Sequence, residues 1–145
     1  GLLGGDTAIT SVLLDGVEVI EIVNSNNSAI VVIAARSNSS NQSGVVRIGA
    51  DSGFFFEQPN AFQYLDEGVV LAVDPSIGQL GTRVVITGTN LRGSGDRVVA
   101  VTLANVPTAL VNESNTVVHV VATEGSAGSG DVVLISESGA TVTKT

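Results

Sequence analysis

The sequence contains no cysteine, methionine or tryptophan, and it has a single histidine. Without cysteine no disulfide can form, so any folded unit must be held together by packing and hydrogen bonds. One histidine and no cysteine also exclude a conventional zinc site. The lack of cysteine does not decide the compartment, because a β-sandwich without disulfides is compatible with an extracellular location.

Basic residues are scarce. Six lysines and arginines stand against 14 aspartates and glutamates, which gives a net charge of −8 and an isoelectric point near 4.3. Such a chain repels phosphate backbones, and this excludes nucleic acid as a partner. An excess of acidic residues more often keeps a protein in solution than forms a binding site.

Long hydrophobic runs are also absent. The longest, Ala29–Ala35, has seven residues, whereas a helix needs about 20 to span a bilayer. We therefore expect no membrane insertion by this segment. No stretch shows an apolar period of 3.6 residues, and short valine-rich runs alternate with clusters of glycine, asparagine and serine. This pattern predicts an all-β fold.

Catalytic motifs are lacking. His119 lies among valines in the segment 116–122, and no nucleophile-elbow sequence is present. No acidic pair stands in a context typical of glycoside hydrolysis. We therefore expect no catalytic residues, no metal site and no enzymatic activity.

The most informative stretch is residues 70–91, in which a short strand, a Pro/Gly turn and an alternating Val/Ile strand end in Gly-Thr-Asn-Leu. This order resembles the IPT/TIG family of immunoglobulin-like domains. The matching residues are Pro75, Gly78, Gly81, Thr82, Val84, Ile86, Gly88, Asn90 and Leu91. The resemblance implies tandem immunoglobulin-like (IPT/TIG, E-set-like) β-sandwiches.

The same unit recurs along the chain. Gly4, Val12, Leu14 and Val17 precede Gly93, Val101, Leu103 and Val106 by 89 residues, and later segments match at slightly shorter offsets. A fixed period is the mark of an array of modules. We expect modules at residues 1–67 and 68–145, the first without its N-terminal strands and the second with an incomplete C-terminal strand. Either the flanking residues of a longer chain or a neighbouring chain would supply these strands.

Expected strands follow from the alternating apolar runs. In the first module they fall near residues 8–14, 17–23, 29–34, 44–49 and 60–65. In the second they fall near residues 69–74, 83–88, 97–103, 107–111, 116–122, 131–135 and 140–144. The junction at residues 65–69 is short, which favours a stiff rod.

Four tripeptides match the acceptor pattern for N-linked glycans. They begin at Asn26, Asn38, Asn41 and Asn112 and lie in expected turns or loops. Loops rich in asparagine and serine also produce this tripeptide by chance, because both residues are favoured in turns. Four sites together favour N-glycosylated loops if the protein passes through a eukaryotic secretory pathway.

Two further features bear on contacts between modules. Consecutive residues of a strand point to opposite faces, so Phe54, Phe55 and Phe56 cannot all be buried in one core. We expect them to pack against an adjacent module, with a sugar-binding platform as the alternative. Asp66 and Glu67 at the junction are further interface candidates. With Asp74 they offer oxygen ligands for Ca²⁺, but no Asp-x-Asp-x-Asp-Gly loop accompanies them, so we expect no bound cofactor other than glycans.

These observations favour a structural or adhesive extracellular repeat protein at the cell surface. Its modules would pack end to end into a rod or fibril, with further copies, adjacent modules and glycans as partners. Two alternatives remain: an accessory, non-catalytic sandwich of a secreted polysaccharide-active enzyme, or a receptor ectodomain. A flanking catalytic domain or a membrane span would distinguish them.

Overall fold

The computed structural model describes residues 1–3, 5, 8–38 and 42–145. All secondary structure in these residues is strand, and none of them forms a helix that is long and apolar enough to cross a bilayer. The chain divides into unit 1, Gly1–Asp66, and unit 2, Glu67–Thr145. The division falls one residue before the boundary expected from the sequence.

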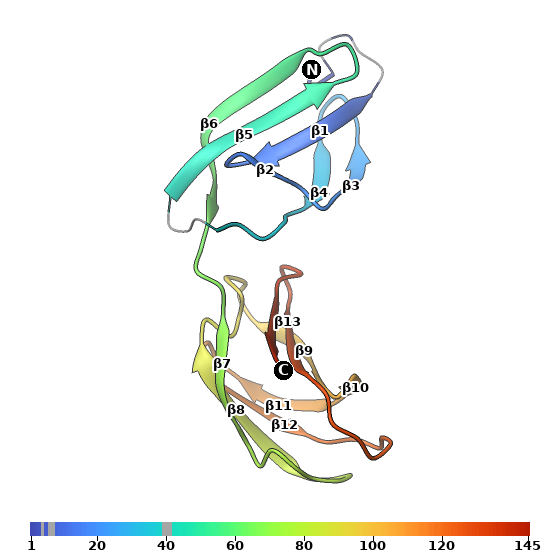
Figure 1. Ribbon diagram of the computed structural model, residues 1–145, viewed down its shortest axis with the longest axis vertical. Helices are drawn as coiled ribbons and strands as arrows, with labels where there is room; N and C mark the ends of the chain where they lie inside the picture. The colour runs from blue at the N-terminus through green and yellow to red at the C-terminus, as the bar shows by residue number, and fades with distance from the viewer. Residues whose placement is uncertain (4, 6–7, 39–41) are drawn as a thin grey trace. The chain divides into compact units, whose positions relative to one another are not determined.

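Unit 2 is a sandwich of two four-stranded antiparallel sheets (Figure 1). Its strands are β7 (Val69–Asp74), β8 (Arg83–Thr89), β9 (Val98–Leu103), β10 (Val106–Pro107), β11 (Ala109–Glu113), β12 (Val117–Val121), β13 (Val132–Ser136) and β14 (Thr141–Lys144). One sheet has the order β10-β9-β13-β14 and the other the order β11-β12-β8-β7. The immunoglobulin-like all-β architecture expected from the sequence is confirmed.

The core of unit 2 lies between these sheets. Alternate residues of each strand point inward, as the period of two requires. In β8, for example, Val84 and Ile86 are buried while Arg83 is exposed. The buried cluster comprises Val70, Val84, Ile86, Leu91, Val98, Val101, Val118, Val120, Leu134 and Val142. The hydrophobic core of this sandwich is therefore aliphatic and contains no aromatic ring.

Unit 1 has one four-stranded sheet and one two-stranded sheet. Its strands are β1 (Ile9–Leu14), β2 (Val17–Glu18), β3 (Glu21–Ser25), β4 (Ile30–Ile33), β5 (Gln42–Ala50) and β6 (Phe55–Tyr64). The larger sheet has the order β2-β1-β5-β6, and the smaller one consists of β3 and β4. A core of Ile9, Val12 and Leu14 lies between them, with Phe62 and Tyr64 packed against it.

The two units repeat the same strand arrangement. The order β2-β1-β5-β6 in unit 1 corresponds to β10-β9-β13-β14 in unit 2, and the hairpin β3–β4 corresponds to β11–β12. Even the bulges agree, because the register shifts between Ile22 and Asn24 in one hairpin and between Leu110 and Asn112 in the other. The internal repeat read from the sequence therefore extends to backbone detail.

Strand β4 and its counterpart β12 differ in their pairing. Strand β12 lies between β11 and β8, whereas within the described part of unit 1 its counterpart β4 pairs with β3 alone. The described part of unit 1 contains no counterpart of the β7–β8 hairpin.

Two elements of unit 1 differ from the expectation. The segment 17–23 divides into β2 and β3, because residues of one run pair with different sheets. Strand β6 begins at Phe55 and not near residue 60. Pro59 lies within β6, which tolerates it because β6 is an edge strand and its register with β5 shifts between Gly44 and Val46.

Candidate functional site

The three consecutive phenylalanines lie on both faces of the β5–β6 sheet. Phe55 pairs with Gly49 and Phe56 with Ile48. Since Ile48 packs on the core, Phe56 faces inward and Phe55 outward. All three remain exposed, by 47%, 49% and 43% for Phe54, Phe55 and Phe56. The prediction that they cannot share one core is confirmed, and their packing against an adjacent module stays a prediction.

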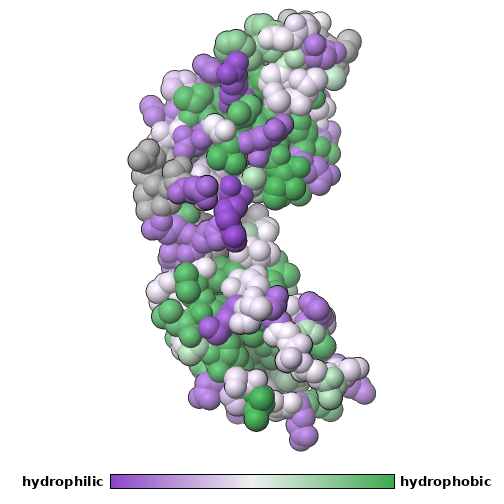
Figure 2. All heavy atoms as spheres, in the orientation of Figure 1, coloured by the Kyte–Doolittle hydropathy of each residue, from purple (hydrophilic) through white to green (hydrophobic). Residues whose placement is uncertain are grey.

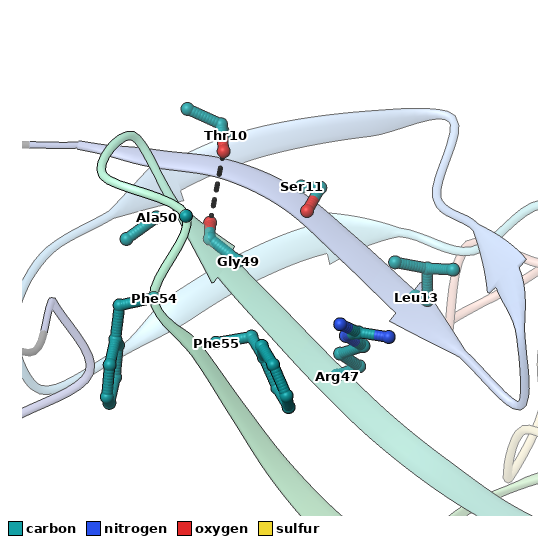
Figure 3. A pocket seen from close by; sticks show the side chains of 9 residues that line it. Thr10, Ser11, Leu13, Arg47, Gly49, Ala50, Phe54 and Phe55 are labelled. Carbon is teal, nitrogen blue, oxygen red and sulfur yellow. Dashed lines mark hydrogen bonds between the residues drawn. The ribbon is translucent and has the colours of Figure 1, made fainter.

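Phe54 and Phe55 border an open depression of about 310 Å³ (Figure 3). Its lining comes from β1, β5 and the turn before β6: Thr10, Ser11, Leu13, Arg47, Gly49, Ala50, Gly53, Phe54 and Phe55. Gly49 leaves space in the floor because it has no side chain; a Cβ there would lie 2.5 Å from the Ser11 hydroxyl oxygen. We call this depression the outer pocket.

The outer pocket combines an aromatic wall with polar groups. The guanidinium carbon of Arg47 lies 4.0 Å from the centroid of the Phe55 ring, a cation–π contact. Arg47 Nε is 3.7 Å from Glu57 Oε1, and both side chains are half-exposed, so this ion pair is weak and leaves the guanidinium accessible. Thr10 Oγ1 donates to the Gly49 carbonyl at 3.3 Å. The pocket therefore offers a ring face, hydroxyls and a cation.

Unit 2 has the corresponding strands but different side chains at this place. By the repeat correspondence, Arg47 is replaced by Val133, Phe54 by Ala140 and Phe55 by Thr141. The aromatic and cationic groups are thus specific to unit 1. Sequence reasoning missed Arg47, Thr10 and Ser11, although a comparison of the two repeats position by position shows the contrast at Arg47.

Unit 2 instead contains a bidentate ion pair between Arg92 and Glu113, which we call the clasp. Glu113 accepts from Arg92 Nε and Nη2, both at 2.9 Å, and from the Val98 amide at 3.1 Å. The hydrogen bonds from Arg92 lower the pKa of Glu113, and the same pairing raises the pKa of Arg92. The corresponding residues of unit 1 are Leu3 and Ser25, so the clasp is not repeated. It fastens the loop before β9 to β11.

The other residues singled out from the sequence lie apart. Asp66, Glu67 and Asp74 are exposed, and among the described residues no group of three histidine or acidic side chains is placed to hold a metal ion. His119 is exposed, and β12, the strand on which it lies, is an inner strand of its sheet.

Three of the four candidate glycan acceptors are exposed: Asn26, Asn38 and Asn112. Asn41 lies outside the described residues. The Asn26 side-chain oxygen accepts from the amides of Ser28 at 2.8 Å and Ala29 at 2.9 Å, which closes the β3–β4 turn. Asn26 is thus both a glycan candidate and a turn residue.

Comparison with known proteins identifies the family. The IPT/TIG domain model matches residues 69–145, which is more than half of the chain. The chain therefore belongs to the IPT/TIG domain family. No curated protein matches it.

Several solved structures are similar in fold. One is SGBP-B of the mixed-linkage glucan utilization locus of Bacteroides ovatus, in complex with a mixed-linkage heptasaccharide, with 17% identity and a TM-score of 0.43 over 92% of this chain. Another is SGBP-B from a complex xyloglucan utilization locus in Bacteroides uniformis, with 16% identity and a TM-score of 0.44 over 94% of this chain. The chain covers 34% and 40% of their lengths, respectively.

Proposed function

We propose that the chain is part of a non-catalytic extracellular repeat protein in which tandem immunoglobulin-like modules have a structural and adhesive role at the cell surface. The observation that carries the proposal is the repetition of backbone detail between the units. Leu2 N donates to Asn27 O at 3.0 Å, and Leu91 N donates to Asn115 O at 3.0 Å. Self-similar modules are the building blocks of linear arrays.

The turns repeat as closely as the strands. Gly53 and Gly139 end equivalent hairpins with φ of 89° and 90°. Each donates to the residue three positions before it, Ala50 or Ser136, at 3.0 Å. The backbone is therefore the same at these turns in both units, while the surface side chains differ. This supports a role as a spacer, in which the exposed faces of each module make the specific contacts. The same proposal places Asp66, Glu67 and Phe54–Phe56 at contacts between adjacent modules, either within one chain or between copies.

Electron microscopy of the natural protein tests this proposal. We expect negative-stain images of material purified from its source to show a row of beads, each of about the size of one module. Shaving intact cells with protease should release peptides of this chain. A single compact particle, or peptides released only after lysis, would contradict the proposal.

The outer pocket favours a second candidate function, the binding of a polysaccharide. An exposed ring can stack on the apolar face of a sugar, while hydroxyls and a guanidinium bind its hydroxyl groups, and a few polar groups of this kind fix the orientation of a ligand. The outer pocket provides these groups from Phe54, Thr10, Ser11 and Arg47. Glycans would then be partners of unit 1 specifically.

Affinity electrophoresis in polysaccharide-containing gels tests this second function. If it is correct, the chain is retarded by at least one polysaccharide and Phe54→Ala abolishes the retardation. Leu71→Ala, which removes a 64% exposed apolar side chain in unit 2, is the matched control and should leave the retardation unchanged. Equal retardation of both variants would contradict a site at the outer pocket.

A further inference from the structure

The floor of the outer pocket is a row of three residues on adjacent strands. Gly49 of β5 pairs with Ser11 of β1 on one side and with Phe55 of β6 on the other. Side chains at paired positions lie on the same face of a sheet, so the Ser11 hydroxyl and the Phe55 ring lie on either side of Gly49. A ligand over Gly49 would therefore have one polar neighbour and one aromatic neighbour.

The next row on the same face carries a charge. Arg47 pairs with Leu13 of β1 and with Glu57 of β6. Because Arg47 is two residues from Gly49 along β5, both residues face outward. Among the nine residues that line the outer pocket, Arg47 is the one with a charged side chain. A ligand over Gly49 would therefore lie next to the guanidinium.

The Arg47 guanidinium is held by the protein but keeps donors for a ligand. Its carbon lies 4.0 Å from the centroid of the Phe55 ring, and Figure 3 shows the two side chains next to each other. Its Nε is 3.7 Å from Glu57 Oε1, which is longer than a hydrogen bond. The side chain is 47% exposed. The stacked ring therefore orients the guanidinium before a ligand arrives, while its N–H groups stay accessible.

The polar groups of the outer pocket favour a ligand that is rich in acceptors. A guanidinium has N–H donors and no acceptor. Thr10 Oγ1 already donates its proton to the Gly49 carbonyl at 3.3 Å. A carboxylate has acceptors only, and its two oxygens match two parallel N–H groups of a guanidinium. A sugar carboxylate therefore fits Arg47 better than a neutral sugar hydroxyl does.

We propose that the outer pocket selects polysaccharides that contain uronic acids, with a sugar ring on Phe54 and its carboxylate on the Arg47 guanidinium. This inference rests on the polysaccharide-binding function proposed above and names the substrate class of that site. Arg47 already covers the Phe55 ring, whereas Phe54 is 47% exposed and is the ring left for the sugar. Arg47 is then the residue that determines specificity.

The rest of the chain makes this selectivity a local property. The net charge of −8 repels polyanions in general. Hydrophilic and hydrophobic residues are intermixed on the visible face of both units (Figure 2), and unit 2 has Val133 in place of Arg47. Attraction for an acidic sugar must therefore come from Arg47 itself and not from a broad basic surface.

Isothermal titration calorimetry with matched sugars tests the selectivity. The probes are oligosaccharides of polygalacturonate, alginate and hyaluronan, each beside its carboxyl-reduced form, in which an alcohol replaces the acid. We expect the full chain to bind at least one acidic probe about tenfold or more tightly than its reduced form. Equal affinity for the two forms, or binding of neutral sugars alone, would overturn the selectivity and leave polysaccharide binding in place. Absence of all binding would contradict both.

Replacement of the cation separates the outer pocket from the overall charge. Arg47→Gln should weaken binding of the acidic probe about tenfold or more and leave the affinity for its reduced form unchanged, because Phe54 and the hydroxyls remain. Arg83→Gln removes the same charge from an exposed residue of unit 2 and is the matched control. We expect it to change neither affinity. An equal loss in both variants would overturn the proposal, and thermal unfolding checks that both are folded.

Two further variants test the geometry at Arg47. The Glu57 carboxylate lies near the guanidinium and repels a ligand carboxylate, so Glu57→Gln should tighten binding of the acidic probe. Arg47→Lys keeps the charge but loses the planar pair of donors, so it should retain only part of the preference for acid. Weaker binding by Glu57→Gln, or a full preference in Arg47→Lys, would overturn the placement of the sugar carboxylate on the guanidinium.

Discussion

Gly88 lies so close to Val69 that a side chain at this position would overlap the Val69 carbonyl oxygen. The two residues belong to paired strands, and Leu91 packs against the same place. Asn90 turns the chain with φ of 50°, a left-handed conformation that asparagine tolerates better than most residues. In the family motif Gly-Thr-Asn-Leu, Gly88 thus allows two strands to approach closely, Asn90 turns the chain and Leu91 is buried in the core.

Replacement of Gly88 tests whether the close approach of β7 and β8 at Val69 is needed for stability. Gly88→Ala should destabilise unit 2 by about 1–3 kcal/mol, because the new methyl group can be accommodated only by displacing backbone. Gly128→Ala is the control, since Gly128 has open space around its Cβ position. Urea unfolding followed by circular dichroism would measure both, and equal stability of the two variants would show that the strands can separate without cost.

Leu91 should be among the largest single contributors to the core of unit 2. It is 1% exposed, so Leu91→Ala is expected to cost about 2–5 kcal/mol of unfolding free energy. Leu71→Ala removes the same atoms from a side chain that is 64% exposed and should change stability by less than about 0.5 kcal/mol. A small effect at Leu91 would mean that the core collapses around the cavity.

The clasp between Arg92 and Glu113 predicts that the free energy of unfolding of unit 2 decreases at low pH. Because pairing lowers the pKa of Glu113 below its ordinary value of 4.5, its contribution is complete above that pH and is lost as the pH falls through the lowered pKa. Glu113→Gln should therefore be less stable than the natural chain at pH 7, and the difference should shrink on acidification.

Denaturant unfolding of the natural chain and Glu113→Gln at pH 7 and at a pH well below 4.5 would measure this change. Glu124→Gln serves as the control, since Glu124 is exposed and its replacement should leave the stability at pH 7 unchanged. A Glu113→Gln deficit that stays constant on acidification would contradict the assignment.

Asn26 is both a candidate glycan acceptor and a residue of the β3–β4 turn, and two different substitutions can distinguish these roles. We expect that, in a eukaryotic secretory host, Ser28→Ala removes one N-glycan while leaving the turn intact, since the Asn26 oxygen is bonded by backbone amides. Asn26→Gln should remove the same glycan and also destabilise unit 1. Intact mass before and after glycosidase treatment, combined with thermal unfolding, distinguishes the two effects; an unchanged mass for Ser28→Ala would show that the site is unoccupied.

The strands of unit 2 were predictable because valine, isoleucine and leucine alternate with polar residues between turns that contain glycine or proline. Strand β7 begins and ends at the expected residues. In unit 1 the prediction was weaker where the local signal misled. The start of β6 was hidden by Pro59, whose position at a sheet edge no local pattern reveals.

The candidate site was less predictable than the fold. The sequence indicated that Phe54, Phe55 and Phe56 could not be buried together, but it did not show which ring faces which way. Register decides this: pairing with Ile48 directs Phe56 inward, and pairing with Gly49 places Phe55 beside Arg47. Arg47 itself has no distinguishing neighbours along the chain, so only cross-strand contacts single it out.

The sequence by itself determined the all-β class, the tandem repeat and the family, because these depend on residue periodicity, turn residues and self-similarity, all of which are local or additive along the chain. Only the tertiary structure decided which aromatic ring contacts the guanidinium of Arg47 and which carboxylate pairs with Arg92. Those outcomes depend on cross-strand pairing, which brings residues that are far apart in the sequence onto one face of a sheet. A pattern of neighbouring residues does not show which distant residues will meet.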